Sequence, residues 1–238
     1  MKAYFLRTVG QPLILSDIPS LDISGEGTEL ELYASAPLCD TDRRYASTVL
    51  RNEASAAVRL WIQNKRYFPR LIISAAVFLI AYVLASFLIR DPLPMIDEIL
   101  IGLAAAAAAW VLLSKNDAKA TVAKEKEKKL FRIINTAEVL NDESLKALED
   151  CYLGLFSYDT AALCSKLVRD ELEAPPVTED VRAAALCYLR THEPLMLKDI
   201  EKIKAGKKKE KTEEELLHLA TTSGLDIYQT AFFCLLLK

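Results

Sequence analysis

Glycine and histidine are scarce in this chain, and their scarcity excludes several chemistries. Seven glycines are spread along 238 residues, and neither GxxxxGK nor GxGxxG occurs, so no phosphate-binding loop is indicated. GxSxG and HExxH are also missing. The two histidines, His192 and His218, fit a helix end and a helix surface better than a catalytic base. We therefore expect a protein without enzymatic activity.

Cysteine is present but unpaired in sequence. The five cysteines include no CxxC pair, and with two histidines they offer no zinc ligand set, so we expect no metal and no cofactor. An odd number of scattered thiols is typical of a reducing compartment, with cysteine packed as a small apolar residue. The formal net charge is −3, and basic residues do not dominate either half, which argues against nucleic acid as a partner. No site for a small-molecule substrate is evident.

Two long apolar segments dominate what is present. The first covers residues 71–89 without a charge, and the second covers about 95–113. Each would form a helix of about 28 Å, close to the thickness of a bilayer core. The prolines of the segment Arg90-Asp91-Pro92-Leu93-Pro94 rule out one continuous helix. The sequence therefore predicts a transmembrane helical hairpin over residues 69–113.

Basic residues indicate the orientation of this hairpin. Residues 51–70 carry five Lys or Arg and residues 114–133 carry seven, whereas the connecting segment has only Arg90. By the positive-inside rule, both termini lie in the cytoplasm and the protein is a two-pass protein of the inner or plasma membrane. We expect aromatic and basic side chains to anchor the hairpin at the inner interface: Trp61, Arg66, Tyr67, Arg70, Trp110 and Lys115.

Six consecutive alanines, 104–109, make the second apolar segment weakly hydrophobic. Small residues spaced by four, such as Ala105 and Ala109, allow another helix to approach closely. This partner is either the first helix of the same hairpin or a second copy of the chain. Asp97 and Glu98 are expected to be solvated at the helix N-terminus, where the dipole favours acids.

The segment before the hairpin, residues 1–68, reads as a small αβ region. Strands are expected at about 3–9, 12–17 and 28–34, the last from its alternation of leucine and glutamate. A loop is expected between them at 19–27. A helix over about 42–65 would cover one face of these strands.

The segment after the hairpin reads as helical throughout. One stalk helix is expected over 114–140, followed by an all-α cytoplasmic domain over 141–238. Asp142, Thr178, Thr212 and Asp226 are candidate helix caps, Gly224 a helix end, and Lys204–Lys211 a solvated basic loop. The last helix, about 227–237, is apolar nearly all round, so it must be buried in the domain or against a partner. Phe232 and Phe233 are therefore candidate interface residues. The predicted fold class is thus a mainly α membrane protein.

Two functions remain open at this level. The first is a membrane-anchored, non-enzymatic interaction or scaffold protein, which presents its helical domain at the inner membrane face and could be an accessory subunit of a larger complex. The alternative is a small homo-oligomeric channel or membrane-perturbing effector built from the hairpin, with Ala105 and Ala109 in the oligomer contact. The expected partners are a lipid bilayer and either another protein or further copies of the chain.

Overall fold

In the computed structural model, residues 1–20, 29–88, 96–117, 121–198, 218, 221 and 225–238 are described. The chain is mostly helical with a small mixed sheet. It divides into two compact units: Met1–Ala54 together with Phe131–Lys238, hereafter the sheet unit, and Ser55–Leu130, hereafter the hairpin unit. The predicted outer turn, the basic loop, the cap at Thr212 and the helix end at Gly224 lie outside the described residues.

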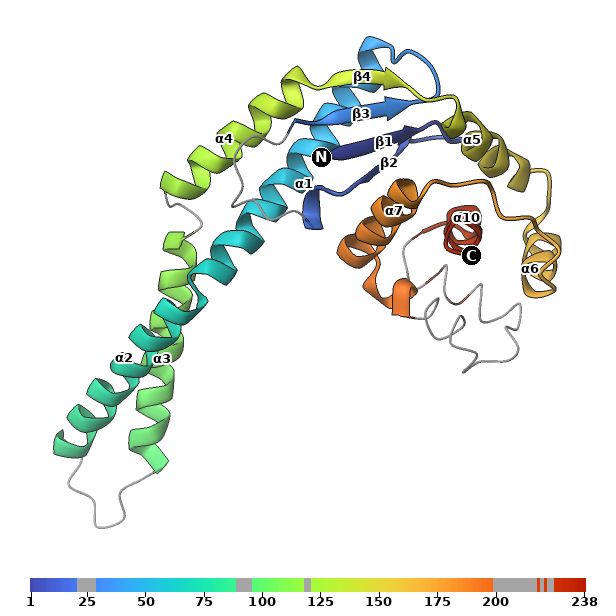
Figure 1. Ribbon diagram of the computed structural model, residues 1–238. Helices are drawn as coiled ribbons and strands as arrows, with labels where there is room; N and C mark the ends of the chain where they lie inside the picture. The colour runs from blue at the N-terminus through green and yellow to red at the C-terminus, as the bar shows by residue number, and fades with distance from the viewer. Residues whose placement is uncertain (21–28, 89–95, 118–120, 199–217, 219–220, 222–224) are drawn as a thin grey trace. The chain divides into compact units, whose positions relative to one another are not determined.

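The sheet unit is organised around four strands in the order β2-β1-β3-β4 (Figure 1). β1 (Lys2–Leu6) pairs antiparallel with β2 (Leu13–Ser16), and on its other side it pairs parallel with β3 (Glu31–Ala34). β3 pairs parallel with β4 (Glu138–Asn141). Gly10 lies in the β1–β2 connection at φ +112°, a backbone conformation that residues with a Cβ rarely adopt. The three N-terminal strands were predicted, although each is shorter than expected.

The chain between β3 and β4 contains the whole hairpin unit. Helix α1 (Asp40–Lys65) follows β3, and then come α2 (Tyr67–Leu88), α3 (Ile96–Asp117) and α4 (Thr121–Thr136). The unit boundaries fall inside α1, at Ala54, and inside α4, at Leu130. The hairpin is therefore an insertion in the crossover that joins two neighbouring parallel strands. Parallel strands require such a crossover, usually helical, and here it is extended by α2 and α3.

Strand β4 corrects two predictions. Residues 114–140 were expected to form one stalk helix, but α4 ends at Thr136 and Glu138–Asn141 is a strand. The segment after the hairpin was expected to be all-α, but it supplies the edge strand of the sheet. The short run Glu-Val-Leu-Asn carries almost no strand signal of its own. Its hydrogen bonds to β3, about 100 residues earlier in the chain, determine its conformation.

The helices that follow β4 include α5 (Ser144–Leu155), α6 (Thr160–Val168), α7 (Glu179–His192) and α10 (Ile227–Leu236). Two predicted caps are confirmed. The Thr178 hydroxyl accepts from the Val181 amide at 3.4 Å, and the Asp226 carboxylate accepts from the Gln229 amide at 2.6 Å. Such caps satisfy amide groups that have no partner within the helix.

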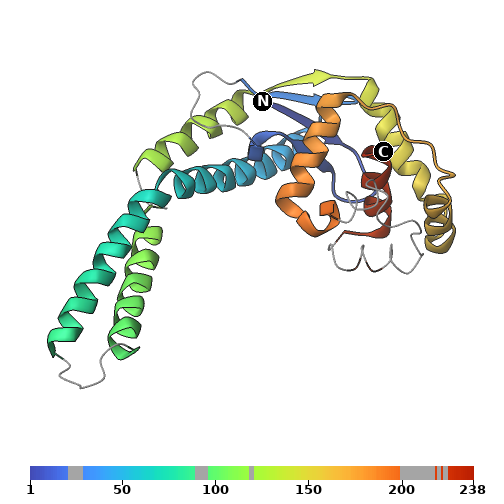
Figure 2. The same ribbon diagram turned by 60° about the horizontal axis from the view of Figure 1, so that its bottom comes forward.

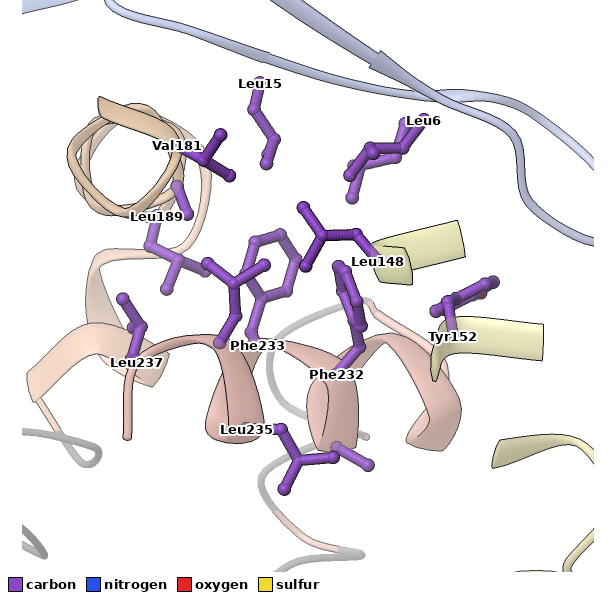
Figure 3. Close-up of a cluster of buried hydrophobic side chains, with 14 of the residues drawn as sticks. Leu6, Leu15, Leu148, Tyr152, Val181, Leu189, Phe232, Phe233, Leu235 and Leu237 are labelled. Carbon is purple, nitrogen blue, oxygen red and sulfur yellow. The ribbon is translucent and has the colours of Figure 1, made fainter. Parts of the chain in front are cut away.

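The sheet unit has three layers. Side chains of one sheet face, including Tyr4, Leu6 and Leu15, join a core with α5, α7 and α10. Alternate residues such as Phe5 and Ile14 point to the opposite face and are also buried, on the side covered by α1 (Figure 1). Figure 3 shows the core around α10, where side chains from the sheet and from several helices converge.

Two buried glutamates connect helices to strand ends. Glu149 of α5 accepts from the Arg7 amide at 2.8 Å and from the Ser35 hydroxyl at 2.6 Å, just beyond the ends of β1 and β3. Glu53 of α1 accepts from the Ser16 hydroxyl of β2, and its other oxygen lies 3.6 Å from Nε2 of His192. Buried carboxylates are tolerated only when they are paired or hydrogen-bonded in this way. Both therefore fix how α1 and α5 sit on the sheet.

Candidate membrane anchor

Helices α2 and α3 expose most of their apolar side chains. Only 17 % of the apolar window in the first and 11 % in the second is buried. A core helix of a soluble protein would be mostly covered by its own chain. Both helices are long and apolar enough to cross a membrane. The exposed large residues are Tyr67, Phe68, Leu71, Ile72, Ile73, Leu79, Ile80, Val83, Leu84 and Phe87 on α2, and Ile96, Ile99, Leu100, Ile101, Leu103, Val111 and Leu112 on α3.

The two helices run side by side (Figure 2) and pack on each other through one face of each. In the middle of α3 the covered positions recur at helical spacing and are small: Gly102, Ala105, Ala106 and Ala109. In the part of α2 that follows Arg70, the covered positions are Ser74, Val77, Phe78, Ala81, Tyr82 and Ala85. A Cβ added to Gly102 would lie 2.9 Å from the Phe78 ring, so the glycine is required for this approach. Ala105 and Ala109 are thus partly covered within the chain, and a role in an oligomer stays a prediction.

An ionic cluster joins one end of α2 to the end of α3. Arg66 and Arg70 each donate to a different oxygen of Asp117, Arg70 through Nε at 2.5 Å. The side chains of Arg70 and Asp117 are only 6 % and 7 % exposed. One turn further along α2, the Ser74 hydroxyl is buried, and neither it nor Nη2 of Arg70 has a hydrogen-bond partner among the described residues. A buried charge pair of this kind holds its two helices in one register, because moving either leaves a charge unpaired.

Aromatic and basic side chains gather in the same part of the hairpin unit. The rings of Tyr67 and Trp110 meet edge to face with centroids 5.6 Å apart. Lys65 and Lys126 lie over the Trp61 ring, with their nitrogens 4.9 and 4.7 Å from its centroid. Mixed aromatic and basic groups of this kind are typical of the boundary between bilayer and water.

The structure brings most of the predicted anchoring residues into contact with one another or with Lys65, Asp117 and Lys126. Arg66 and Arg70 meet on Asp117, and Tyr67 meets Trp110, whereas Lys115 is exposed and belongs to neither group. The contacts of Asp117 and Lys126 were not predicted. The sequence did contain a signal for the contact of Asp117. It is a single acid just after the second apolar segment, and two arginines lie just before the first.

The break between α1 and α2 has a covalent cause. Pro69 has no amide hydrogen, so it cannot donate to the carbonyl of Lys65, where α1 ends. The helical hydrogen bonds are intact on either side of this gap: the Arg66 amide donates to the Ile62 carbonyl, and the Arg70 amide donates to the Arg66 carbonyl. Pro69 is thus placed in the first turn of α2, where proline is tolerated.

Glu98 corrects a further prediction. Asp97 is exposed, as expected for a solvated residue at the start of α3, but Glu98 is only 2 % exposed. Its Oε1 has no hydrogen-bond partner among the described residues. Adjacent residues on a helix do not share a face, so Glu98 is covered while Asp97 is exposed.

The candidate interface residues of the last helix lie in the core instead of on the surface. Phe232 and Phe233 are 1 % and 0 % exposed (Figure 3). The Phe232 ring lies 5.2 Å from that of Tyr152, and the Phe233 ring stacks on that of Tyr188 at 5.5 Å. A partner could reach them only if α10 left the sheet unit.

Comparisons of the chain with protein-family models, with curated protein sequences and with solved structures found no match.

Proposed function

We propose that this protein is a non-enzymatic membrane-anchored interaction protein. The hairpin unit inserts into a bilayer, and the sheet unit is presented at the cytoplasmic face, where it recruits or organises a protein partner. The observation that carries the proposal is the continuous apolar surface of α2 and α3, which their own chain leaves uncovered. Patches of this kind are rare on soluble monomers and mark a membrane or a protein interface.

Three features support a bilayer as the cover of this surface. The apolar helices have the length of a membrane span. Their small-residue stripe is used for packing on each other, which leaves the large apolar side chains facing outward. The aromatic and basic side chains gather where the two helices meet α1 and α4 in the sequence, which fits the inner interface.

The topology of the chain supports the presentation of the sheet unit. Because the hairpin is inserted between β3 and β4, the chain enters it through α1 and leaves it through α4. An anchored hairpin would tether the sheet unit to the membrane at two points. A double tether limits rotation of the sheet unit and raises its effective concentration toward a membrane-bound partner.

Cysteine labelling in intact cells tests the anchoring and its orientation. Cys39 is exposed, so it can report the sheet unit once the other four cysteines are replaced by serine. A second variant, also with Cys39→Ser, carries Leu93→Cys in the segment that joins the apolar helices. We expect a membrane-impermeant maleimide to label position 93 in intact cells, and Cys39 only after lysis. Labelling of Cys39 in intact cells, or release of the chain from membranes by alkaline carbonate, would contradict the proposal.

Purification of the full chain in a mild detergent tests the interaction half. Stoichiometric co-purification of a second protein, identified by mass spectrometry, is the expected outcome. A homogeneous self-oligomer with no other protein would instead favour the channel hypothesis, and ion flux through liposomes would then decide it.

A further inference from the structure

A cavity of about 600 Å³ opens in the sheet unit between α1, α4 and the strands β3 and β4. Its large apolar lining residues, called the apolar floor below, are Leu32, Leu50, Ile134 and Val139. Its polar lining includes three arginines from α1: Arg43, Arg44 and Arg51. The cavity lies within one unit and uses none of the residues assigned to membrane anchoring.

The helical repeat of α1 explains why the arginines meet there. Residues 43, 47 and 51 are spaced by four, so they lie on one face of the helix, and Arg44 borders it. Ala46, Leu50 and Ala54 are buried on the sheet side of α1. That packing fixes the rotation of α1 and directs its arginine face to the cavity.

The arginines differ in how they are held. Arg51 donates through Nη2 to Oδ1 of Asn135 at 2.5 Å, and its guanidinium lies 5.7 Å from the centroid of the Phe131 ring. It thereby joins α1 to α4. Arg43 and Arg44 are exposed, and within the described residues no hydrogen bond or ion pair engages their guanidinium groups. The only carboxylate in the lining is that of Asp40, so three positive charges face one negative charge.

We propose that this cavity binds a ligand that carries a phosphoryl group. Guanidinium groups pair with phosphate oxygens through two parallel hydrogen bonds, and two of them lie here without a partner among the described residues. The Ser47 hydroxyl and the Asn135 amide, both in the lining, can donate further hydrogen bonds to an anion. The volume lies in the range of small-molecule sites, roughly 300–1,000 Å³, and exceeds that of a single phosphate ion. The ligand is therefore a phosphate ester with a body that rests on the apolar floor.

Such an ester could be a soluble molecule or a lipid headgroup, and two probes separate these sources. Calorimetric titration of the full chain in maltoside micelles, which contain no phosphate, uses inorganic pyrophosphate in one arm. The other arm uses dihexanoyl phosphatidic acid below its micelle concentration. Binding of pyrophosphate would assign a soluble ligand, and binding of the short-chain lipid alone would assign a headgroup.

Charge-matched variants make the test specific to the cavity. Arg43→Gln with Arg44→Gln should weaken binding at least about tenfold, because hydrogen bonds to charged groups are lost. Arg190→Gln removes an exposed arginine of the same unit outside this cavity and should change the affinity less than about twofold. Asp40→Asn removes the opposing carboxylate and should strengthen binding. Added NaCl should weaken it.

Three results would overturn the proposal. The first is that neither probe gives a heat of binding at millimolar concentration. The second is that the double variant binds as tightly as the unmodified chain. The third is that Arg190→Gln weakens binding as much as the double variant does. The double variant should keep the melting temperature of the parent, since in the part of the chain that the structure describes the two guanidinium groups have no partner to lose. Arg43→Lys with Arg44→Lys adds a check, because it keeps the charge and removes the paired hydrogen bonds. We expect its affinity to lie between those of the parent and the glutamine variant.

Discussion

Helices α10 and α2 are the two most apolar helices of the described chain, and the structure treats them in opposite ways. The ten residues of α10 are covered by α5, α6 and α7, and its phenylalanines are fully buried. The 22 residues of α2 pack mainly on α3, and most of their large side chains stay exposed. The same composition thus ends in a core in one case and on a surface in the other.

Length and neighbours explain this difference. Three helices and a sheet face supply enough surface to surround a helix of three turns, such as α10. A pair of long apolar helices cannot surround itself, because each covers only one stripe of the other. Removing apolar surface from water is worth about 25 cal/mol per Å², so the uncovered faces favour a second environment. On our proposal, that environment is a bilayer.

The largest expected effect is a difference in unfolding free energy between two phenylalanine variants, one in α10 and one in α2. Phe233→Ala leaves a cavity in the sheet unit and should cost about 3–5 kcal/mol of unfolding free energy. Phe87→Ala on α2, where the side chain is 79 % exposed, should cost little in detergent, since detergent covers the ring in either state. Circular dichroism melts of both variants in maltoside measure the contrast. Equal losses for the two variants would mean that Phe87 is buried against a part of the protein.

The ionic cluster of the hairpin unit gives the next effect. Asp117→Ala leaves the buried Arg70 without its partner and should cost about 3 kcal/mol. Asp97→Ala, which removes an exposed acid from the same helix, should cost less than about 0.5 kcal/mol. Tryptophan fluorescence during a thermal melt can follow the loss, because Trp110 packs on Tyr67, beside Arg66.

A double variant separates the role of charge from that of shape at this site. Arg70→Met with Asp117→Leu replaces the pair by apolar side chains and should recover most of the lost stability. If Asp117→Ala alone melted like the parent, the buried pair would contribute nothing to the hairpin.

Close packing of α2 on α3 predicts a smaller effect. Gly102→Val should push α3 away from the Phe78 ring and cost about 1–3 kcal/mol. Ala104→Val adds methyl groups to an exposed position two residues away and serves as the matched control. Unfolding by increasing fractions of dodecyl sulfate in mixed micelles compares the variants. An unchanged Gly102→Val transition would mean that the helices do not approach closely at this position.

The hairpin could be predicted from the sequence because its signal is compositional. An uncharged run of nineteen residues needs no tertiary information to read as a membrane helix. β4 could not be predicted in that way. Its four residues follow an amphipathic helix without a turn signal, and their strand conformation depends on pairing with β3 across the whole inserted hairpin.

The same distinction applies to the sites. Aromatic and basic residues beside apolar segments suggest an interface directly, so most of the side chains that gather there were named from the sequence, and their anchoring role stays a prediction. The cavity arginines have no such signal, since Arg43, Arg44 and Arg51 read only as the polar face of a helix. They enclose a volume because α4 and β4 return to α1, and that return was not predicted. Burial of Glu98 depends likewise on the rotation of α3 against α2.

Replacing the buried Tyr152 should have the smallest effect on stability at neutral pH. Its ionisation at high pH tests how well the core around α10 excludes water. Burial raises the pKa of Tyr152, whose ring packs on Phe232, to about 12, with a further contribution from Asp226. A tyrosine in the unfolded chain ionises near pH 10. The stabilisation from the neutral phenol is therefore complete below about pH 10 and is lost as the pH rises toward 12. Tyr152→Phe should leave the melting temperature at pH 7 nearly unchanged and reduce its decline between pH 10 and 12. The difference in absorbance near 295 nm between parent and variant reports the ionisation of Tyr152 directly. A midpoint of this ionisation near pH 10 would mean that water reaches the core under α10.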